Sequence, residues 1–209
     1  MKVDPKIFEH GKKLPVVEEF YSIQGEGFHF GKPAYFLRIG GCDVGCSWCD
    51  TKFSWNPSLH PVIEVDAILK NIVSCPAKAT VITGGEPLIY DLDYLCTMLK
   101  REGIETLLET SGSHPLSGIW DWICLSPKKQ LPPLEEIYPL AGELKVIIAT
   151  TEDFLWAEEC SLKVVSKCEL YLQPEWSVYE EILPQIVDYI LKYPKWKISL
   201  QAHKFMHIP

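Results

Sequence analysis

The sequence contains no apolar run that approaches the ~20 residues needed to cross a bilayer. Its first residues, MKVDPKIFEHGKK, also lack the apolar segment of a secretory signal. Positive charge is in deficit, because 20 Lys and Arg stand against 28 Asp and Glu, which gives a net charge of −8. These features disfavour a membrane span, secretion and broad binding to nucleic acid or anionic membranes. We expect a cytoplasmic protein, in which a few local basic side chains still suffice to bind an anionic small molecule.

Low-complexity segments, long linkers and clear repeats are also missing. What is present is a chain of 209 residues, 47% of them hydrophobic, which is enough for a full core. Because domains tend to split beyond ~250–300 residues, we expect a single domain over residues 1–209.

Apolar runs typical of strands alternate with helical patterns along the chain. We expect strands at 33–40, 79–83, 105–110, 121–126, 143–150, 168–174 and 197–201, and helices at 64–73, 91–101, 152–162 and 178–192. This alternation predicts βαβ units and a mostly parallel sheet, whose functional site lies at the carboxyl ends of its strands. Polar segments follow six of these strands, namely GCDVGC, TGGEP, ETSG, SPKK, QPE and QAHK. We therefore expect one shared site at that rim.

Eight cysteines are unlikely to form a disulfide framework in a cytoplasmic chain of this size. Five are scattered, mostly beside apolar residues, and we expect them to be core or surface thiols: Cys75, Cys96, Cys124, Cys160 and Cys168. The other three form a C-x3-C-x2-C cluster: Cys42, Cys46 and Cys49.

This cluster indicates a metal site of one of two kinds. Structural zinc needs four ligands, usually two pairs, and the sequence has no second C-x2-C pair. Each iron of a cubic iron–sulfur cluster needs an outer ligand, so three cysteines leave one iron open to a substrate or cofactor. Zinc with a distant fourth ligand remains the alternative.

The run CDVGCSWC, with Trp48 before its last cysteine, resembles the motif of radical S-adenosylmethionine enzymes, and TGGEP at 83–87 resembles their second signature. The resemblance implies a [4Fe–4S] cluster on Cys42, Cys46 and Cys49. It also implies that the amino and carboxylate groups of S-adenosylmethionine bind the open iron. One electron then cleaves the cofactor to a 5′-deoxyadenosyl radical.

A narrower resemblance covers nearly the whole chain. FYSIQGEGFHFGKPAYFLRIGGC at 20–42, the CDT run at 49–51, ETSG, SPK and the ending LQAHKFMHIP resemble 7-carboxy-7-deazaguanine synthases of the deazapurine pathways. Glycyl-radical-enzyme activases, which act on a protein, are the main alternative, because SIQGEG occurs there in milder form. The CDT run and the QAHK tail favour the pterin enzyme.

The resemblance implies a partial, open βα barrel of about six strands, since a full eight-stranded barrel typically needs ~250 residues. It implies ring contraction of 6-carboxy-5,6,7,8-tetrahydropterin to 7-carboxy-7-deazaguanine with loss of ammonia, assisted by Mg²⁺. It also implies a homodimer and an electron donor such as flavodoxin or ferredoxin.

Site roles follow from the same resemblance. Thr51 is expected to bind Mg²⁺, as a hard oxygen ligand. S-adenosylmethionine is expected to contact Trp48, Gly84, Gly85, Glu86, Ser111, Ser126, Lys128 and Gln173. The pterin is expected to contact Gln24, Glu26, Arg38, Thr83, His203 and Pro209. For Arg38, a structural ion pair with Glu18 or Glu19 is the alternative.

Overall fold

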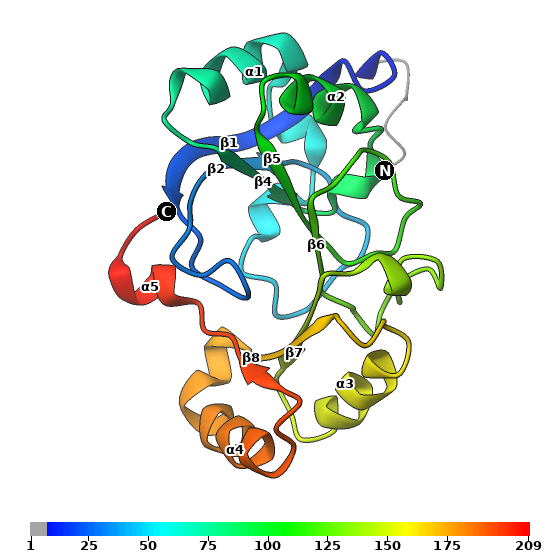
Figure 1. Ribbon diagram of the computed structural model, residues 1–209, viewed down its shortest axis with the longest axis vertical. Coiled ribbons are helices and arrows are strands. Elements are labelled where there is room, and N and C mark those ends of the chain that lie inside the picture. The colour runs from blue at the N-terminus through cyan, green and yellow to red at the C-terminus, as the bar shows by residue number, and fades with distance from the viewer. Residues whose placement is uncertain (1–7) are drawn as a thin grey trace.

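The computed structural model describes residues 8–209, and within them the strands form one sheet in the order β3-β1-β2-β4-β5-β6-β7-β8-β9. From β2 to β9 every neighbouring pair is parallel, whereas β1 pairs antiparallel with both β2 and β3. The sheet curves into an arc that does not close, with β1 and β2 at one end and β7 and β8 toward the other (Figure 1). This is the partial, open barrel that the sequence predicts.

The strand bounds are β1 Lys13–Ile23, β2 Pro33–Ile39, β3 Val62–Glu64, β4 Ala79–Gly84, β5 Glu105–Thr110, β6 Trp122–Leu125, β7 Glu143–Ile148, β8 Glu169–Pro174 and β9 Lys197–Ile198. The six parallel strands from β2 to β8 correspond to the six strands expected of the barrel. The seventh expected strand is reduced to the two residues of β9. Neither β1 nor β3 was predicted, because β1 carries Pro15 and the acidic pair Glu18–Glu19 and β3 spans only three residues.

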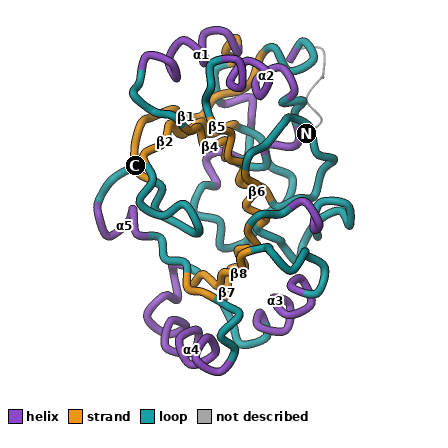
Figure 2. Tube along the Cα trace, viewed as in Figure 1, coloured by secondary structure: helices purple, strands orange, loops and turns teal. Residues whose placement is uncertain are grey.

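The helices are α1 Val65–Ser74, α2 Asp93–Arg101, α3 Asp153–Ser161, α4 Tyr179–Lys192 and α5 Ala202–Met206. The first four match the predicted helices, and α4 continues through Pro184. The helices α1 and α2 lie at one end of the arc and α3 and α4 at the other, outside the strands (Figure 2). No helix among residues 8–209 has the length and apolar character needed to cross a membrane.

Two hydrophobic clusters hold these layers together. One joins β1, β2, β4 and β5 to α1 and α2 and includes Leu37, Ile68 and Leu95, while the other joins β7 and β8 to α3 and α4 and includes Val146, Ala157 and Ile186. All six side chains are fully buried or nearly so. The outer face of the arc is therefore packed against the helices. The alternate residues of β2, β4 and β5 form a third apolar cluster of Ala34, Phe36, Ala79, Val81 and Leu107. The inner face thus carries apolar side chains as well as the polar ones of the site.

Candidate functional site

The three clustered cysteines lie in the loop that follows β2. The loop is held by its own backbone, because Gly41 N donates to Ser54 O at 2.7 Å and Cys42 N donates to Trp55 O at 3.1 Å. Cys46 is buried, Cys42 and Cys49 are half-buried, and no disulfide joins cysteines within the described part of the chain. Three thiols are thus presented together on one short loop.

The surroundings of these thiols fit an iron–sulfur cluster. Burial raises the pKa of the Cys42 thiol, whereas hydrogen bonds from the backbone around Val44 and Gly45 lower it. Burial also raises the pKa of Cys46, and the ammonium group of Lys128 opposes this. Backbone donors and a half-buried cation stabilise the negative charge that thiolates carry on a cluster. The donor set therefore suits the group that the motif implies.

The turn after β4 packs directly on this loop. A Cβ added at Gly84 would collide with the carbonyl oxygen of Ile39, and one added at Gly85 would collide with that of Gly41. Gly84 also has a φ of +149°, a backbone conformation that residues with a side chain rarely adopt. Two glycines are needed here because the backbones of the two segments touch.

The carboxylate of Glu86 points away from the cavity. Oε1 accepts hydrogen bonds from Leu88 N at 3.0 Å and Thr110 Oγ1 at 2.6 Å, and Oε2 accepts from Ser111 N at 2.7 Å. The side chain is 1% exposed and is absent from the described residues that line the cavity. Glu86 thus ties the turn to the end of β5, and the contact with the cofactor amine that the sequence predicts stays a prediction.

A cavity of about 440 Å³ opens on the inner face of the arc. It is lined by every other residue that the sequence predicts for the site: Gln24, Glu26, Arg38, Cys42, Cys46, Trp48, Cys49, Thr51, Thr83, Gly84, Gly85, Ser111, Ser126, Lys128, Gln173, His203 and Pro209. The carboxyl-end rim of the sheet therefore does gather the motifs. The lining also includes residues that the sequence analysis did not single out: Asp50, Glu109, Cys124, Lys145, Gln201 and Lys204.

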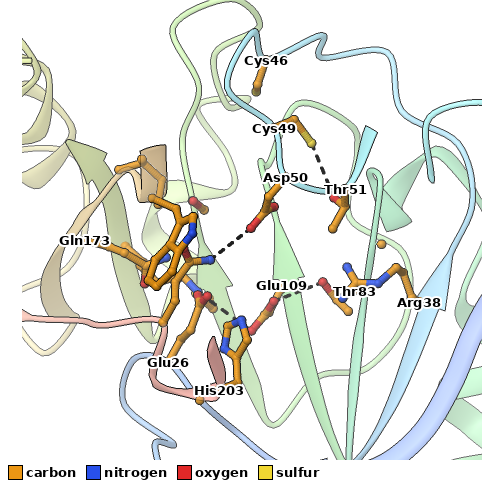
Figure 3. A pocket seen from close by; sticks show the side chains of 18 of the residues that line it. Glu26, Arg38, Cys46, Cys49, Asp50, Thr51, Thr83, Glu109, Gln173 and His203 are labelled. Carbon is orange, nitrogen blue, oxygen red and sulfur yellow. Dashed lines mark hydrogen bonds and ion pairs between the residues drawn. The ribbon is translucent and has the colours of Figure 1, made fainter. Parts of the chain in front are cut away.

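The floor of the cavity is a network of buried charges (Figure 3). Glu109 on β5 accepts hydrogen bonds from Gln24 Nε2 at 3.0 Å and Thr83 Oγ1 at 3.1 Å. Lys145 on β7 donates to Glu26, and its Nζ lies 3.9 Å from Glu109 Oε1. The sequence analysis placed Glu109 at this rim only as part of ETSG, without a role of its own, and it missed Lys145.

Lys145 and Glu26 form an ionised pair. Burial opposes the charged form of Lys145, but Cys124, Glu26 and Glu109 outweigh it and hold the pKa of Lys145 well above its usual value. Burial likewise raises the pKa of Glu26, and the ammonium of Lys145 overcomes this and lowers it. The floor therefore offers fixed carboxylates and one ammonium to a ligand.

The C-terminal tail closes one side of the cavity. Ala202 N donates to Gly25 O at 3.0 Å, and a Cβ at Gly25 would collide with His203. Lys204 Nζ donates to Asp50 Oδ2 at 2.8 Å, which ties α5 to the cysteine loop. Pro209 O accepts from Ser22 Oγ at 3.4 Å, so the last residue reaches β1. The tail thus joins the loop after β1, which carries Gly25, to the loop that carries the cysteines.

Two further predicted residues have structural partners as well as a place on the wall. Arg38 Nε donates to Glu18 Oε1 at 2.7 Å, which is the alternative considered from the sequence, and Arg38 also lines the cavity. Thr51 Oγ1 lies 3.5 Å from Cys49 Sγ, beside the cysteine loop. Both side chains keep polar atoms within reach of a ligand.

Known proteins resemble this chain along its whole length. The Radical SAM superfamily matches residues 37–125. The 7-carboxy-7-deazaguanine synthase of Flavobacterium psychrophilum is 54% identical over 201 residues, which cover 96% of this chain and 95% of that protein. The synthase of Synechocystis sp. is 48% identical over 194 residues, or 93% of each chain. A crystal structure of QueE from Escherichia coli superposes with a TM-score of 0.82 at 28% identity, covering 97% of this chain and 100% of that one.

Proposed function

Because the chain belongs to the family of 7-carboxy-7-deazaguanine synthases, within the Radical SAM superfamily, we propose that it converts 6-carboxy-5,6,7,8-tetrahydropterin to 7-carboxy-7-deazaguanine and ammonia. The observation that carries this proposal is that one cavity of about 440 Å³ brings the three-thiol loop together with a floor of amide, carboxylate and ammonium groups. A cofactor at the loop and a heterocycle at the floor would share one space.

Cys42, Cys46 and Cys49 would hold the [4Fe–4S] cluster. Together with bound S-adenosylmethionine, this group would supply radical chemistry that removes a hydrogen atom from the substrate. The cofactor contacts that we propose are Trp48, Gly84, Gly85, Ser111, Ser126, Lys128 and Gln173, all of which line the cavity. We now give Glu86 a positioning role, since its carboxylate oxygens already accept hydrogen bonds from the end of β5.

The floor would bind the pterin edge. Glu26 and Glu109 are acceptors for the N–H groups of an amino-pyrimidinone ring, and a carboxylate that accepts two such bonds forms a strong charge-assisted pair. Gln24 orients Glu109 through its 3.0 Å hydrogen bond, and Thr83 does so from the opposite side. Four side chains from three segments, the loop after β1, β4 and β5, would thereby fix the ring in one orientation.

The substrate carboxylate needs a cationic partner, and Arg38 supplies one. Its guanidinium has five donors, so binding a carboxylate leaves donors for Glu18. His203 and Pro209 of the tail, which both line the cavity, would contact the pterin. Thr51 would offer its hydroxyl oxygen to Mg²⁺, with substrate oxygens and water completing the coordination.

The alternative is an activase that acts on a protein. What supports the pterin enzyme is the tail, because α5 bridges Gly25 and Asp50 across one side of the cavity, and such a closed wall suits a small molecule. We also propose a cytoplasmic homodimer that receives electrons from a flavodoxin or ferredoxin, which size measurement and reduction assays with each donor would test.

The direct test of this function is anaerobic reconstitution with iron and sulfide, followed by incubation with dithionite, S-adenosylmethionine and 6-carboxytetrahydropterin. We expect a brown protein and a product with the mass of 7-carboxy-7-deazaguanine. A brown protein that cleaves the cofactor and leaves the pterin intact would favour the activase. A colourless protein that binds zinc would refute both.

A further inference from the structure

Behind the floor lies a second, much smaller cavity of about 10 Å³, which is the room of one water molecule. Five residues line both cavities: Gln24, Glu26, Glu109, Cys124 and Lys145. These residues form a wall one side chain thick. A group in the small cavity is therefore separated from the large cavity by one layer of side chains.

Glu143, the first residue of β7, lines the small cavity and is 3% exposed. Its two oxygens differ sharply. Oε2 accepts hydrogen bonds from Phe28 N at 3.2 Å and Trp122 Nε1 at 3.3 Å. Oε1 lies against Gly27 and has no hydrogen-bond partner among residues 8–209. Oε1 has no donor to stabilise a negative charge, so it is the oxygen that can carry a proton, and a water in the small cavity could accept from it.

The local charge balance favours the same state. Lys145 is the ammonium group of a buried cluster that already contains the carboxylates of Glu26 and Glu109. A third buried carboxylate would be left without a counter-charge, which is strongly unfavourable in a dry interior. Burial raises the pKa of Glu143, although Lys145 opposes this. Other titratable groups that face this cluster are His29, Cys124, Cys168, Tyr171 and His203.

A second unpartnered atom lies in the same wall. Nε2 of His29 is buried and has no hydrogen-bond partner in the described part of the chain. The His29 ring packs on Trp122 with centroids 5.1 Å apart, so it is held beside the indole that donates to Glu143. A water in this cavity would find polar partners in both side chains and in the wall, as buried waters require.

We propose that Glu143 is a protonated carboxylic acid that exchanges its proton, through one water in the small cavity, with Lys145 and Glu109 in the floor of the pterin pocket. The catalytic role of Glu143 rests on the proposed function, whereas its protonation does not.

The proton balance of ammonia loss gives the role. The C–N bond breaks with its electron pair on nitrogen, and the nitrogen takes a proton from the ammonium of Lys145. Glu143 restores that proton through the water and becomes a carboxylate. As the contracted ring becomes aromatic, one of its carbons releases a proton to Glu109. Glu109 passes this proton through the water to Glu143. Glu143 gives up one proton and regains one, so these proton transfers balance and need no external oxidant or reductant.

The protonation is tested first by infrared spectroscopy of the protein at neutral pH, without substrate. We expect the carbonyl band of a protonated carboxylic acid in the wild type, its loss in Glu143→Gln and its retention in Glu158→Gln. Glu158 is the matched control, because it also accepts an indole N–H, from Trp196 Nε1 at 2.8 Å, but it is ion-paired with Lys195 and lies outside both cavities. An unchanged band in Glu143→Gln, or no band in the wild type, would overturn the proposal.

Trp122→Phe provides a second test of the infrared assignment and leaves the carboxyl group of Glu143 in place. Removing the indole donor to Oε2 should shift the same band without abolishing it, and an unshifted band would overturn the assignment to Glu143. The variant also keeps an aromatic ring for stacking on Phe28, whose ring lies 4.5 Å from that of Trp122.

The catalytic role is tested by kinetics of the reconstituted holoenzyme. Glu143→Gln should bind pterin with unchanged affinity and form product at least about tenfold more slowly, as expected for loss of a proton donor. Glu158→Gln should form product at the wild-type rate. A wild-type rate in Glu143→Gln would overturn the relay. If the wild type itself forms no product, the proposed function fails, while the infrared result still decides the protonation.

Discussion

At the cysteine end of the cavity, backbone atoms of the segments 39–42 and 84–86 touch one another and leave room only for glycine. At the floor, charged side chains from separate strands and loops hold one another in place. The first kind of site depends on local sequence and tolerates no added atoms. The second depends on charge balance over long sequence distances. The two ends should therefore respond differently to mutation.

The largest effect should follow removal of one thiol. Cys46→Ala should abolish cofactor cleavage and lower the iron content, because one iron loses its thiolate ligand. Pterin affinity, measured by calorimetry, should be retained, since the floor does not include this loop. Loss of pterin binding together with iron would show that the two ends are not separable.

Next in size is the effect of Lys145→Met on stability. The substitution leaves the largely buried carboxylate of Glu26 without its cation, and breaking such a pair typically lowers the free energy of unfolding by about 3–5 kcal/mol. Chemical denaturation measures it. Lys163→Met, which removes the exposed ion pair with Glu135 at 2.6 Å, is the control and should change little. Equal losses in the two variants would contradict the importance of the buried network.

The same network predicts three contributions to the pH dependence of stability, one of which is lost as pH falls and two as pH rises. The pKa of Glu26 is lowered, so its stabilisation is present above its usual value and is lost as pH falls through the folded value. The pKa of Lys145 is raised, so its stabilisation is lost only as pH rises through its high folded value. The pKa of Glu143 is raised, so its contribution declines as pH rises above the usual carboxylate value. The stability of Glu143→Gln relative to the wild type should therefore increase across that last window, and a constant difference would contradict it.

A smaller effect is expected for Glu86→Gln, which tests whether Glu86 positions the turn or contacts the cofactor directly. Glu86→Gln keeps an acceptor but replaces one carboxylate oxygen by an amide that cannot accept from Ser111 N. We expect about 1–3 kcal/mol loss of stability for the unsatisfied buried group. Affinity for S-adenosylmethionine, measured on the folded variant, should stay close to that of the wild type. A large loss of affinity at unchanged stability would restore the direct contact that the sequence predicts.

The smallest effect should come from the tail. Lys204→Met removes the 2.8 Å bond to Asp50, an ion pair that is partly exposed, and should weaken pterin binding only a few-fold, in line with about 0.2–1 kcal/mol for exposed pairs. Lys204→Met combined with Asp50→Asn should cost no more than either change alone. Additive losses would show that the two side chains act separately.

The part of the site formed by the cysteine loop and the TGGEP turn could be predicted from the sequence. The cysteines and the TGGEP turn lie in short contiguous segments, so their spacing already specifies their geometry. For Glu86, a signal was present and was not used. An acidic residue directly before a proline is typical of a capped turn, and its side chain does cap Leu88 N.

The floor was harder to predict because its residues meet only in the fold. Lys145 and Glu109 come from different strands, and Asp50 meets Lys204 from the other end of the chain. One local signal existed, since Glu143 and Lys145 alternate on one face of an otherwise apolar strand. Charged residues are rarely buried unless they are paired, so this alternation indicates a partnered polar site inside the barrel.

The central claim is that the cofactor radical and the pterin meet in this one cavity. The measurement that tests it most directly uses pterin deuterated at C6, incubated with the reconstituted enzyme and S-adenosylmethionine under reducing conditions. The account predicts that the deuterium is transferred to the deoxyadenosyl carbon of the cofactor and that 7-carboxy-7-deazaguanine forms. Cofactor that is cleaved without acquiring deuterium, in the presence of unreacted pterin, would contradict it.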